Sequence, residues 1–198
     1  MAIIVDKIQK RKDIALSCKE LFFKNGIGNL TISEIAKTAG VGKGTIYDYF
    51  KNKEDIVFEI VNIMIQERNI IKEKKLSQTV NTKDKIKLFS GFFYNDEDAE
   101  LRQLYKEFIS ISLATQDKDM IAFQTECSNN YFSWFGKIIQ DGIDRGELIE
   151  GSDKFARGLF VMAEGMFITS EVTSNISNLK EEIHNNIDAL FELIEVKK

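Results

Sequence analysis

The sequence predicts an all-α protein, with a small N-terminal domain of three helices and a larger helical C-terminal domain. Proline is absent from all 198 residues, although ordinary usage would give about ten. Because proline breaks helix interiors, its absence favours long uninterrupted helices. Apolar residues make up 43 % of the chain, and along most segments they recur at the three- and four-residue steps of a helix face.

Two short helices joined by a tight turn are predicted over residues 31–50. Thr31 and Glu34 have the spacing of a capping box, in which each side chain satisfies a free backbone N–H group of the other residue. Gly40 stands where a helix end usually requires a left-handed backbone, and a second helix runs from Lys43 to Phe50. This is the helix-turn-helix pattern, whose second helix enters the major groove of DNA.

This region resembles the TetR family of bacterial transcription regulators. Most of the family's signature is present in the right order and spacing: Thr31-Ile32, Ile35-Ala36, Ala39-Gly40-Val41, Gly44-Thr45, Tyr47, Phe50 and Lys53-Glu54. The resemblance implies a homodimeric DNA-binding protein. We expect residues 1–55 to form the helix-turn-helix DNA-binding domain and residues 56–198 to form the effector-binding and dimerisation domain.

The resemblance also implies DNA contacts at the positions that the family commonly uses: Thr31, Lys43, Gly44, Thr45, Tyr47, Tyr49 and Lys53. Gly44 has no side chain, so the helix start can approach the sugar-phosphate backbone closely. Lys43 and Lys53 place cations at two helix starts, where free N–H groups also favour phosphate.

Two residues depart from the commoner family pattern. Gly42 stands where Ser or Ala is more usual, so one hydroxyl contact is missing. Asp48 would be unfavourable beside phosphate, although it could accept from a cytosine amino group or orient Lys43. The alternative is that Asp48 faces solvent. Lys43, Thr45 and Asp48 are the candidates for reading bases.

The charge distribution fits a DNA contact at one end of the chain. The net charge is −4, but residues 1–55 contain ten Lys/Arg against seven Asp/Glu. A basic N-terminal region followed by an acidic C-terminal region favours a nucleic-acid partner for the N-terminal region only. The cluster Lys7, Lys10, Arg11 and Lys12 either faces solvent or lies along the phosphates.

Further helices are predicted on both sides of the helix-turn-helix. Their expected ranges are residues 6–25, 53–75, 82–93, 98–115, 118–144 and 152–174, with a last helix opened by Asn178. The highly charged stretch from Glu67 to Lys75 is expected to bridge the two domains.

A recognition helix of two turns reads too few bases for specificity alone, so a two-fold dimer on inverted half-sites is expected. The last two helices present apolar side chains for such a dimer: Leu159, Met162, Met166, Ile183, Ile187, Leu190, Phe191 and Ile194. The alternative is that this stripe packs only inside its own subunit.

Aromatic residues are concentrated in the C-terminal region and predict a pocket for a small, largely apolar effector. The candidate ligand-binding residues are Phe89, Tyr105, Phe108, Phe123, Cys127, Tyr131, Trp134, Glu164 and Phe167. Each aromatic residue could equally belong to an ordinary core. Glu164 could face a cationic ligand or be exposed on the back of its helix.

The sequence predicts neither an enzyme nor a cofactor or metal site. His184 is the only histidine, which removes His-rich metal sites and most nucleophile–base pairs. Cys18 and Cys127 are expected to be free thiols in a reducing cytoplasm, and no apolar run is long enough to span a membrane.

The sequence therefore favours a repressor that binds a palindromic double-stranded operator and releases it on effector binding. The alternative function is a helical protein-interaction module that uses the helix-turn-helix as a scaffold. Such a module would not need Lys43, Thr45, Tyr47 and Lys53 together.

Overall fold

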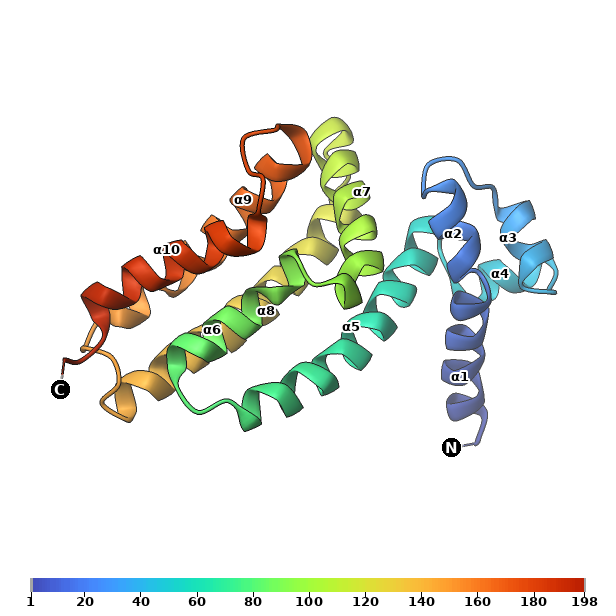
Figure 1. Cartoon of the computed structure of the whole chain (residues 1–198). Helices are drawn as coiled ribbons and strands as arrows, with labels where there is room; N and C mark the ends of the chain where they lie inside the picture. The colour runs from blue at the N-terminus through green and yellow to red at the C-terminus, as the bar shows by residue number, and fades with distance from the viewer. Residues whose placement is uncertain (1, 198) are drawn as a thin grey trace. The chain divides into compact units, whose positions relative to one another are not determined.

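The structure, a computed structural model, describes residues 2–197 and the side chains from residue 7 onward, and it confirms the all-α class (Figure 1). The helices are α1 (Ala2–Ser17), α2 (Lys19–Asn25), α3 (Ile32–Thr38), α4 (Lys43–Tyr49), α5 (Lys53–Gln78), α6 (Thr82–Ser90), α7 (Ala99–Thr115), α8 (Lys118–Asp144), α9 (Ala156–Val172) and α10 (Leu179–Ile194). Short 3₁₀ helices η1, η2 and η3 cover Gly91–Phe93, Asp96–Asp98 and Ser152–Phe155.

The chain divides into two compact units. The first contains Met1–Asn69 and Glu100–Phe123, and the second contains Ile70–Ala99 and Gln124–Lys198. Helix α5 therefore begins in the first unit and ends in the second. The functional boundary expected near residue 55 separates DNA binding from effector binding, and it stays a prediction.

The first predicted helix is two helices, because the backbone turns at Cys18. The Cys18 N–H group donates to the Ala15 carbonyl, three residues back, at 3.1 Å. Cys18 is fully buried, and the helix resumes at Lys19 and ends at Asn25.

The helix-turn-helix is held by the local bonds that its sequence predicts. The Glu34 N–H group donates to Thr31 Oγ1 at 3.3 Å, and the Thr31 N–H group donates to Glu34 Oε2 at 2.9 Å. Gly40 has a φ of +67°, and beyond it the Val41 N–H group reaches back to the Ala36 carbonyl at 3.0 Å. These bonds are a capping box and a Schellman ending, so both ends of α3 are fixed by nearby residues.

The second unit packs α10 against α6 and α9 (Figure 1). Thr82, the first residue of α6, is tied to Glu147 after α8: its N–H and hydroxyl groups both donate to Glu147 Oε2 at 2.7 Å. Arg145 donates to the other carboxylate oxygen of Glu147 at 2.7 Å. These bonds fix the start of α6 against the end of α8.

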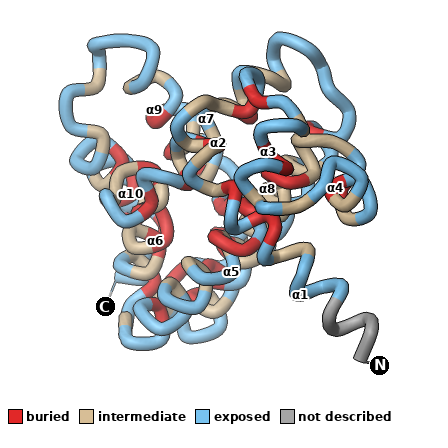
Figure 2. Tube along the Cα trace, turned by 90° about the vertical axis from the view of Figure 1, so that its right-hand side faces the viewer, coloured by how far each residue is buried: buried red, intermediate tan, exposed pale blue. Residues whose placement is uncertain are grey.

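Burial separates the helix-turn-helix into an inner and an outer face. Figure 2 shows only a short buried segment in each of α3 and α4. These segments contain Ile35 and Ala36 in α3, and Ile46 in α4. The rest of both helices is partly or fully exposed.

Candidate DNA-binding site and aromatic core

Arg11 on α1 fixes the end of the recognition helix α4. Its guanidinium group donates to the backbone carbonyl of Tyr49, and it lies over the Phe50 ring at 4.2 Å from the centroid. It also forms ion pairs of 2.8 Å with Asp55 and 2.9 Å with Glu59, both on α5. One side chain therefore joins three helices, and the orientation of α4 depends on it.

The outer face of α4 carries most of the predicted DNA-contacting residues. Tyr47 is 61 % exposed, and Lys43, Gly44 and Asp48 are also exposed. A Cβ atom added at Gly44 would meet nothing within 4 Å. Packing inside the chain therefore does not require a glycine at this position. Thr45 is partly buried on the same short helix.

Three other predicted DNA-contacting residues also bond within the chain. Lys53 Nζ donates to the carbonyls of Gly28 at 2.8 Å and Leu30 at 3.2 Å, and so holds the loop before α3. Thr31 forms the capping box described above. Tyr49 is partly buried, and Lys7 Nζ lies 5.9 Å from the centroid of its ring. These contacts position the helix-turn-helix, and the predicted DNA contacts of these residues stay predictions.

The predicted ligand-binding residues fall into two sets, one in each unit. In the first unit, Phe108 and Phe123 lie edge to face at 5.7 Å, and Phe58 stacks on Phe123 at 4.5 Å. Tyr105 also belongs to this unit and is partly buried. The second unit contains the others: Phe89, Cys127, Tyr131, Trp134, Glu164 and Phe167.

Phe89 is at the centre of the aromatic set in the second unit. Its ring lies edge to face with Tyr131 at 6.0 Å, Trp134 at 5.2 Å and Phe135 at 5.3 Å. Phe167 is buried and packs against Phe93 at 5.8 Å. Glu164 is only partly buried on the same helix. Burial raises the pKa of the Cys127 thiol to about 11, so this thiol stays protonated and unreactive at neutral pH.

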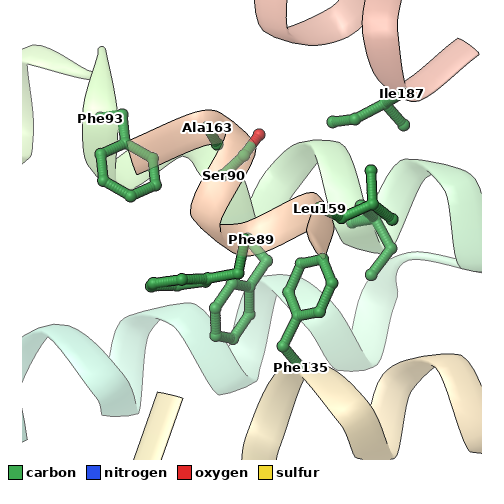
Figure 3. A pocket seen from close by; sticks show the side chains of 9 residues that line it. Phe89, Ser90, Phe93, Phe135, Leu159, Ala163 and Ile187 are labelled. Carbon is green, nitrogen blue, oxygen red and sulfur yellow. The ribbon is translucent and has the colours of Figure 1, made fainter. Parts of the chain in front are cut away.

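A small cavity lies among these rings in the second unit (Figure 3). Its volume is about 10 Å³, and the lining residues are Ile86, Phe89, Ser90, Phe93, Phe135, Leu159, Phe160, Ala163 and Ile187. Figure 3 shows Phe89 and Phe135 lying next to each other at this cavity. Space of this size holds at most one water molecule. An effector would therefore have to displace side chains that now fill the core.

The side chains predicted for the dimer interface differ in burial. Leu159, Ile183, Ile187, Phe191 and Ile194 are buried within the chain itself. They pack in the core of their own unit. An amphipathic pattern is compatible with such packing as well as with a dimer interface. Met162, Met166 and Leu190 are partly buried. Other apolar side chains on the same two helices are exposed: Val161, Ile168, Val172 and Leu193.

One arginine and one lysine have defined roles in the structure that the sequence did not single out. Arg11 was one of four clustered basic residues, and no local pattern distinguishes it from Lys12. Lys72 belongs to a charged stretch but lies over the rings of the second unit, with its Nζ 4.8 Å from the Phe89 centroid. A signal did exist, because Lys72 follows the buried residues Val61 and Met64 at helical spacing and precedes buried Leu76.

Comparison with known proteins identifies the helix-turn-helix. The sequence profile of bacterial regulatory proteins of the tetR family matches residues 18–60. The crystal structure of a TetR-family transcriptional regulator from Cytophaga hutchinsonii covers 98 % of this chain and 98 % of its own, with a TM-score of 0.74 and 18 % identity. The chain belongs to the TetR family.

Two further matches of this TetR-family chain are with regulators from Bacillus subtilis. The fatty acid metabolism regulator protein of Bacillus subtilis is 29 % identical over 152 residues, which are 74 % of this chain and 75 % of the relative. The crystal structure of the transcriptional regulator FadR from Bacillus subtilis in complex with stearoyl-CoA has a TM-score of 0.63. It is 27 % identical and covers 90 % of this chain and 96 % of its own.

The TetR-family chain is thus a transcription regulator, and its relatives indicate no catalytic family. Within residues 2–197, no helix is long and apolar enough to cross a membrane. Among the described side chains, no group of three His, Cys, Asp or Glu residues could hold a metal ion.

Proposed function

We propose that this protein is a cytoplasmic repressor that binds a palindromic operator as a homodimer and releases it when a small, largely apolar ligand binds. The observation that carries the proposal is the outer face of α4. This face exposes Lys43, Gly44, Tyr47 and Asp48 together, while Arg11 holds the C-terminal end of the helix. A scaffold for protein contacts would not need a cation, a bare glycine and a phenol on one fixed helix face.

A homodimer follows from the length of the recognition helix. Helix α4 has 7 residues, about two turns, so one copy contacts only a few base pairs. A two-fold dimer gains specificity by binding two half-sites. Helix α9 offers a surface for the second copy, because Gly158, Val161, Gly165, Ile168 and Val172 lie on one exposed face. A Cβ atom added at either glycine would meet nothing within 4 Å, so a second helix can approach closely there.

The effector class follows from the aromatic core. The small cavity beside Phe89 has an apolar lining with a single hydroxyl group, that of Ser90. The FadR structure noted above contains stearoyl-CoA, which has a long apolar chain. Both observations support a ligand whose larger part is apolar. Ligand entry would expand the closed core, and DNA affinity would fall because the ligand binds only the expanded state.

Selection of bound fragments from a random pool of DNA duplexes tests this function. We expect recovery of an inverted repeat whose binding weakens steeply as salt rises. Lys43→Ala should weaken operator binding by about tenfold through the loss of a phosphate or base contact. Lys137→Ala is the matched control, because it removes one exposed charge from α8 in the second unit. Folded protein that selects no sequence would favour the interaction-module alternative.

A further inference from the structure

Three aromatic rings of the second unit surround the ammonium group of Lys72. The Nζ atom lies 4.8 Å from the centroid of Phe89, 5.3 Å from that of Tyr131 and 6.0 Å from that of Trp134. Tyr131 and Trp134 are three residues apart on α8, and the Phe89 ring on α6 is nearly perpendicular to both, at 81° and 88°. We call these three rings the aromatic cage.

The surroundings of the cage favour a positive charge. The faces of aromatic rings carry the negative part of the ring quadrupole and attract cations within about 6 Å. Asp98, on the 3₁₀ helix η2, is buried. Burial lowers the pKa of Lys72 to about 8, although the negative charges of Asp98 and Glu97 oppose this shift. The cage therefore attracts the charge of the lysine but strips much of the water from it.

Lys72 is an imperfect occupant of this cage. A primary ammonium group is strongly hydrated and needs hydrogen-bond acceptors, yet within the described part of the chain Lys72 Nζ forms no hydrogen bond or ion pair. The neighbouring Lys75, by contrast, pairs with Glu97 at 2.7 Å. An ammonium group that carries alkyl substituents loses less hydration on burial and makes more contact with the rings.

We propose that the aromatic cage of Phe89, Tyr131 and Trp134 is a binding site for an organic cation with apolar substituents, and that Lys72 is its resident competitor. The ligand is a quaternary or alkylated ammonium compound, whose cationic group replaces the lysine between the rings. Lys72 is only partly buried, so its flexible stem can carry the displaced ammonium group to solvent. This inference rests on the proposed function in one respect: the cation is the effector.

The position of Lys72 gives this exchange a route to the DNA-binding helix. Lys72 lies on α5, which is one continuous helix from Lys53 to Gln78. The same helix provides Asp55 and Glu59, the two carboxylates that hold Arg11. Displacement of Lys72 removes its own contacts with the rings on α6 and α8. The bound cation thus favours a different placement of the helix that supports α4.

The fluorescence of Trp134 reports directly on the cage, because Trp134 is the only tryptophan in the chain. The probe is benzyltrimethylammonium, titrated into the full-length protein without DNA. Neopentylbenzene, its uncharged carbon isostere, and phenylacetate, an anion of similar size, are titrated in parallel. We expect a saturable change with the cation alone. An equal response to the isostere or to phenylacetate, or no response to the cation, would overturn the proposal.

Two variants separate the cage from a general apolar site. Lys72→Ala vacates the cage and should tighten cation binding by about threefold to thirtyfold, the range that a cation–π contact implies. Tyr131→Leu removes one ring and should weaken binding by about threefold or more. Phe132→Leu is the matched control, since Phe132 is the next residue on α8 and contacts Phe160 and Arg157 instead. Unchanged affinity in both cage variants would reject the assignment.

The operator recovered by selection then distinguishes this inference from the function on which it rests. Failure to select any operator counts against the repressor function and leaves the fluorescence result standing. Cation binding that leaves operator affinity unchanged overturns the effector role, while the cage remains a cation site. Operator release by the cation in the unaltered protein supports both.

Discussion

Gly44 is the residue at which we expect folding and DNA binding to make opposite demands. It does not have a positive φ, and an added Cβ atom would meet open space. Alanine should therefore stabilise the protein by up to about 1 kcal/mol, because glycine is unfavourable within a helix. The same methyl group would hold α4 away from the DNA and should weaken operator binding by about tenfold through lost base contacts.

Thermal unfolding and operator titration of Gly44→Ala check both parts of this prediction. Gly136→Ala is the control, because Gly136 also lies within a helix and an added Cβ atom there would meet nothing within 4 Å. It should gain stability without changing DNA affinity. Full operator affinity in Gly44→Ala would show that the close approach of the backbone does not occur.

Glu147 makes stability depend on pH. Burial disfavours its charge, but hydrogen bonds from Arg145 and Thr82 outweigh this effect and lower its pKa to about 2. A carboxylate with a lowered pKa stabilises the folded state above its unfolded pKa of 4.5, and this stabilisation is lost as pH falls towards 2. The Glu147 side chain is partly exposed to solvent, which screens its charge, so we expect a contribution of only about 1 kcal/mol.

Urea unfolding at pH 7 and pH 3 measures this contribution. Glu147→Gln should be less stable than the unaltered protein at pH 7, and the difference should shrink at pH 3. Glu150→Gln serves as the control, since Glu150 is exposed. An equal loss of stability at both pH values would mean that the amide fails for steric reasons and that the charge has no role.

At the scale of helices and turns, Arg11 joins α1 to the end of α4 and the start of α5. Arg11→Ala removes the bond to the Tyr49 carbonyl and both ion pairs, so we expect a loss of about 2 kcal/mol in unfolding free energy. Operator affinity should also fall, because α4 loses its orientation. Lys12→Ala removes one charge from the next residue and should change neither quantity by much.

Arg11→Lys distinguishes charge from geometry in the same pair of measurements. Lysine keeps the charge but lacks the planar fork that reaches Asp55, Glu59 and the Tyr49 carbonyl together. It should therefore recover less than half of the lost stability. Full recovery would mean that charge alone accounts for the role of Arg11.

Structural features formed by residues close together in sequence were predicted better than contacts between residues far apart in sequence. Thr31, Glu34 and Gly40 act within a few residues of one another, so their spacing alone predicts the ends of α3. Arg11 meets Asp55 across 43 intervening positions, as the 44-residue separation of this pair implies, and no periodic pattern encodes that contact. Periodicity likewise shows that Phe108 and Phe89 face a core, but it does not show that they belong to different units.

Periodicity also does not identify which apolar surface meets a second copy of the chain. An apolar stripe such as Ile183, Ile187 and Phe191 shows that one face of a helix is covered, and its own subunit covers it here. The exposed stripe on α9 is less apolar in sequence, because two of its five members are glycines. Burial in the folded chain is needed to tell these faces apart.

For the whole molecule, we expect the exposed face of α9 to determine whether one chain or two binds DNA. Ile168 is at this face, between Gly165 and Val172, and is 37 % exposed. Two-fold symmetry places each changed residue in the interface twice, and burial of unpaired carboxylates there is strongly unfavourable. Ile168→Asp should therefore raise the dimer dissociation constant by about a hundredfold or more.

Sedimentation equilibrium measures this change, with Leu113→Asp as the control, because Leu113 on α7 is 74 % exposed and lies outside α9. The control should remain dimeric. Ile168→Asp should sediment as a folded monomer and bind a full inverted repeat no more tightly than a single half-site, because only the dimer engages both halves at once. A dimeric Ile168→Asp protein would exclude α9 as the interface. A monomer that still prefers the full repeat would instead mean that the two chains associate on the DNA itself.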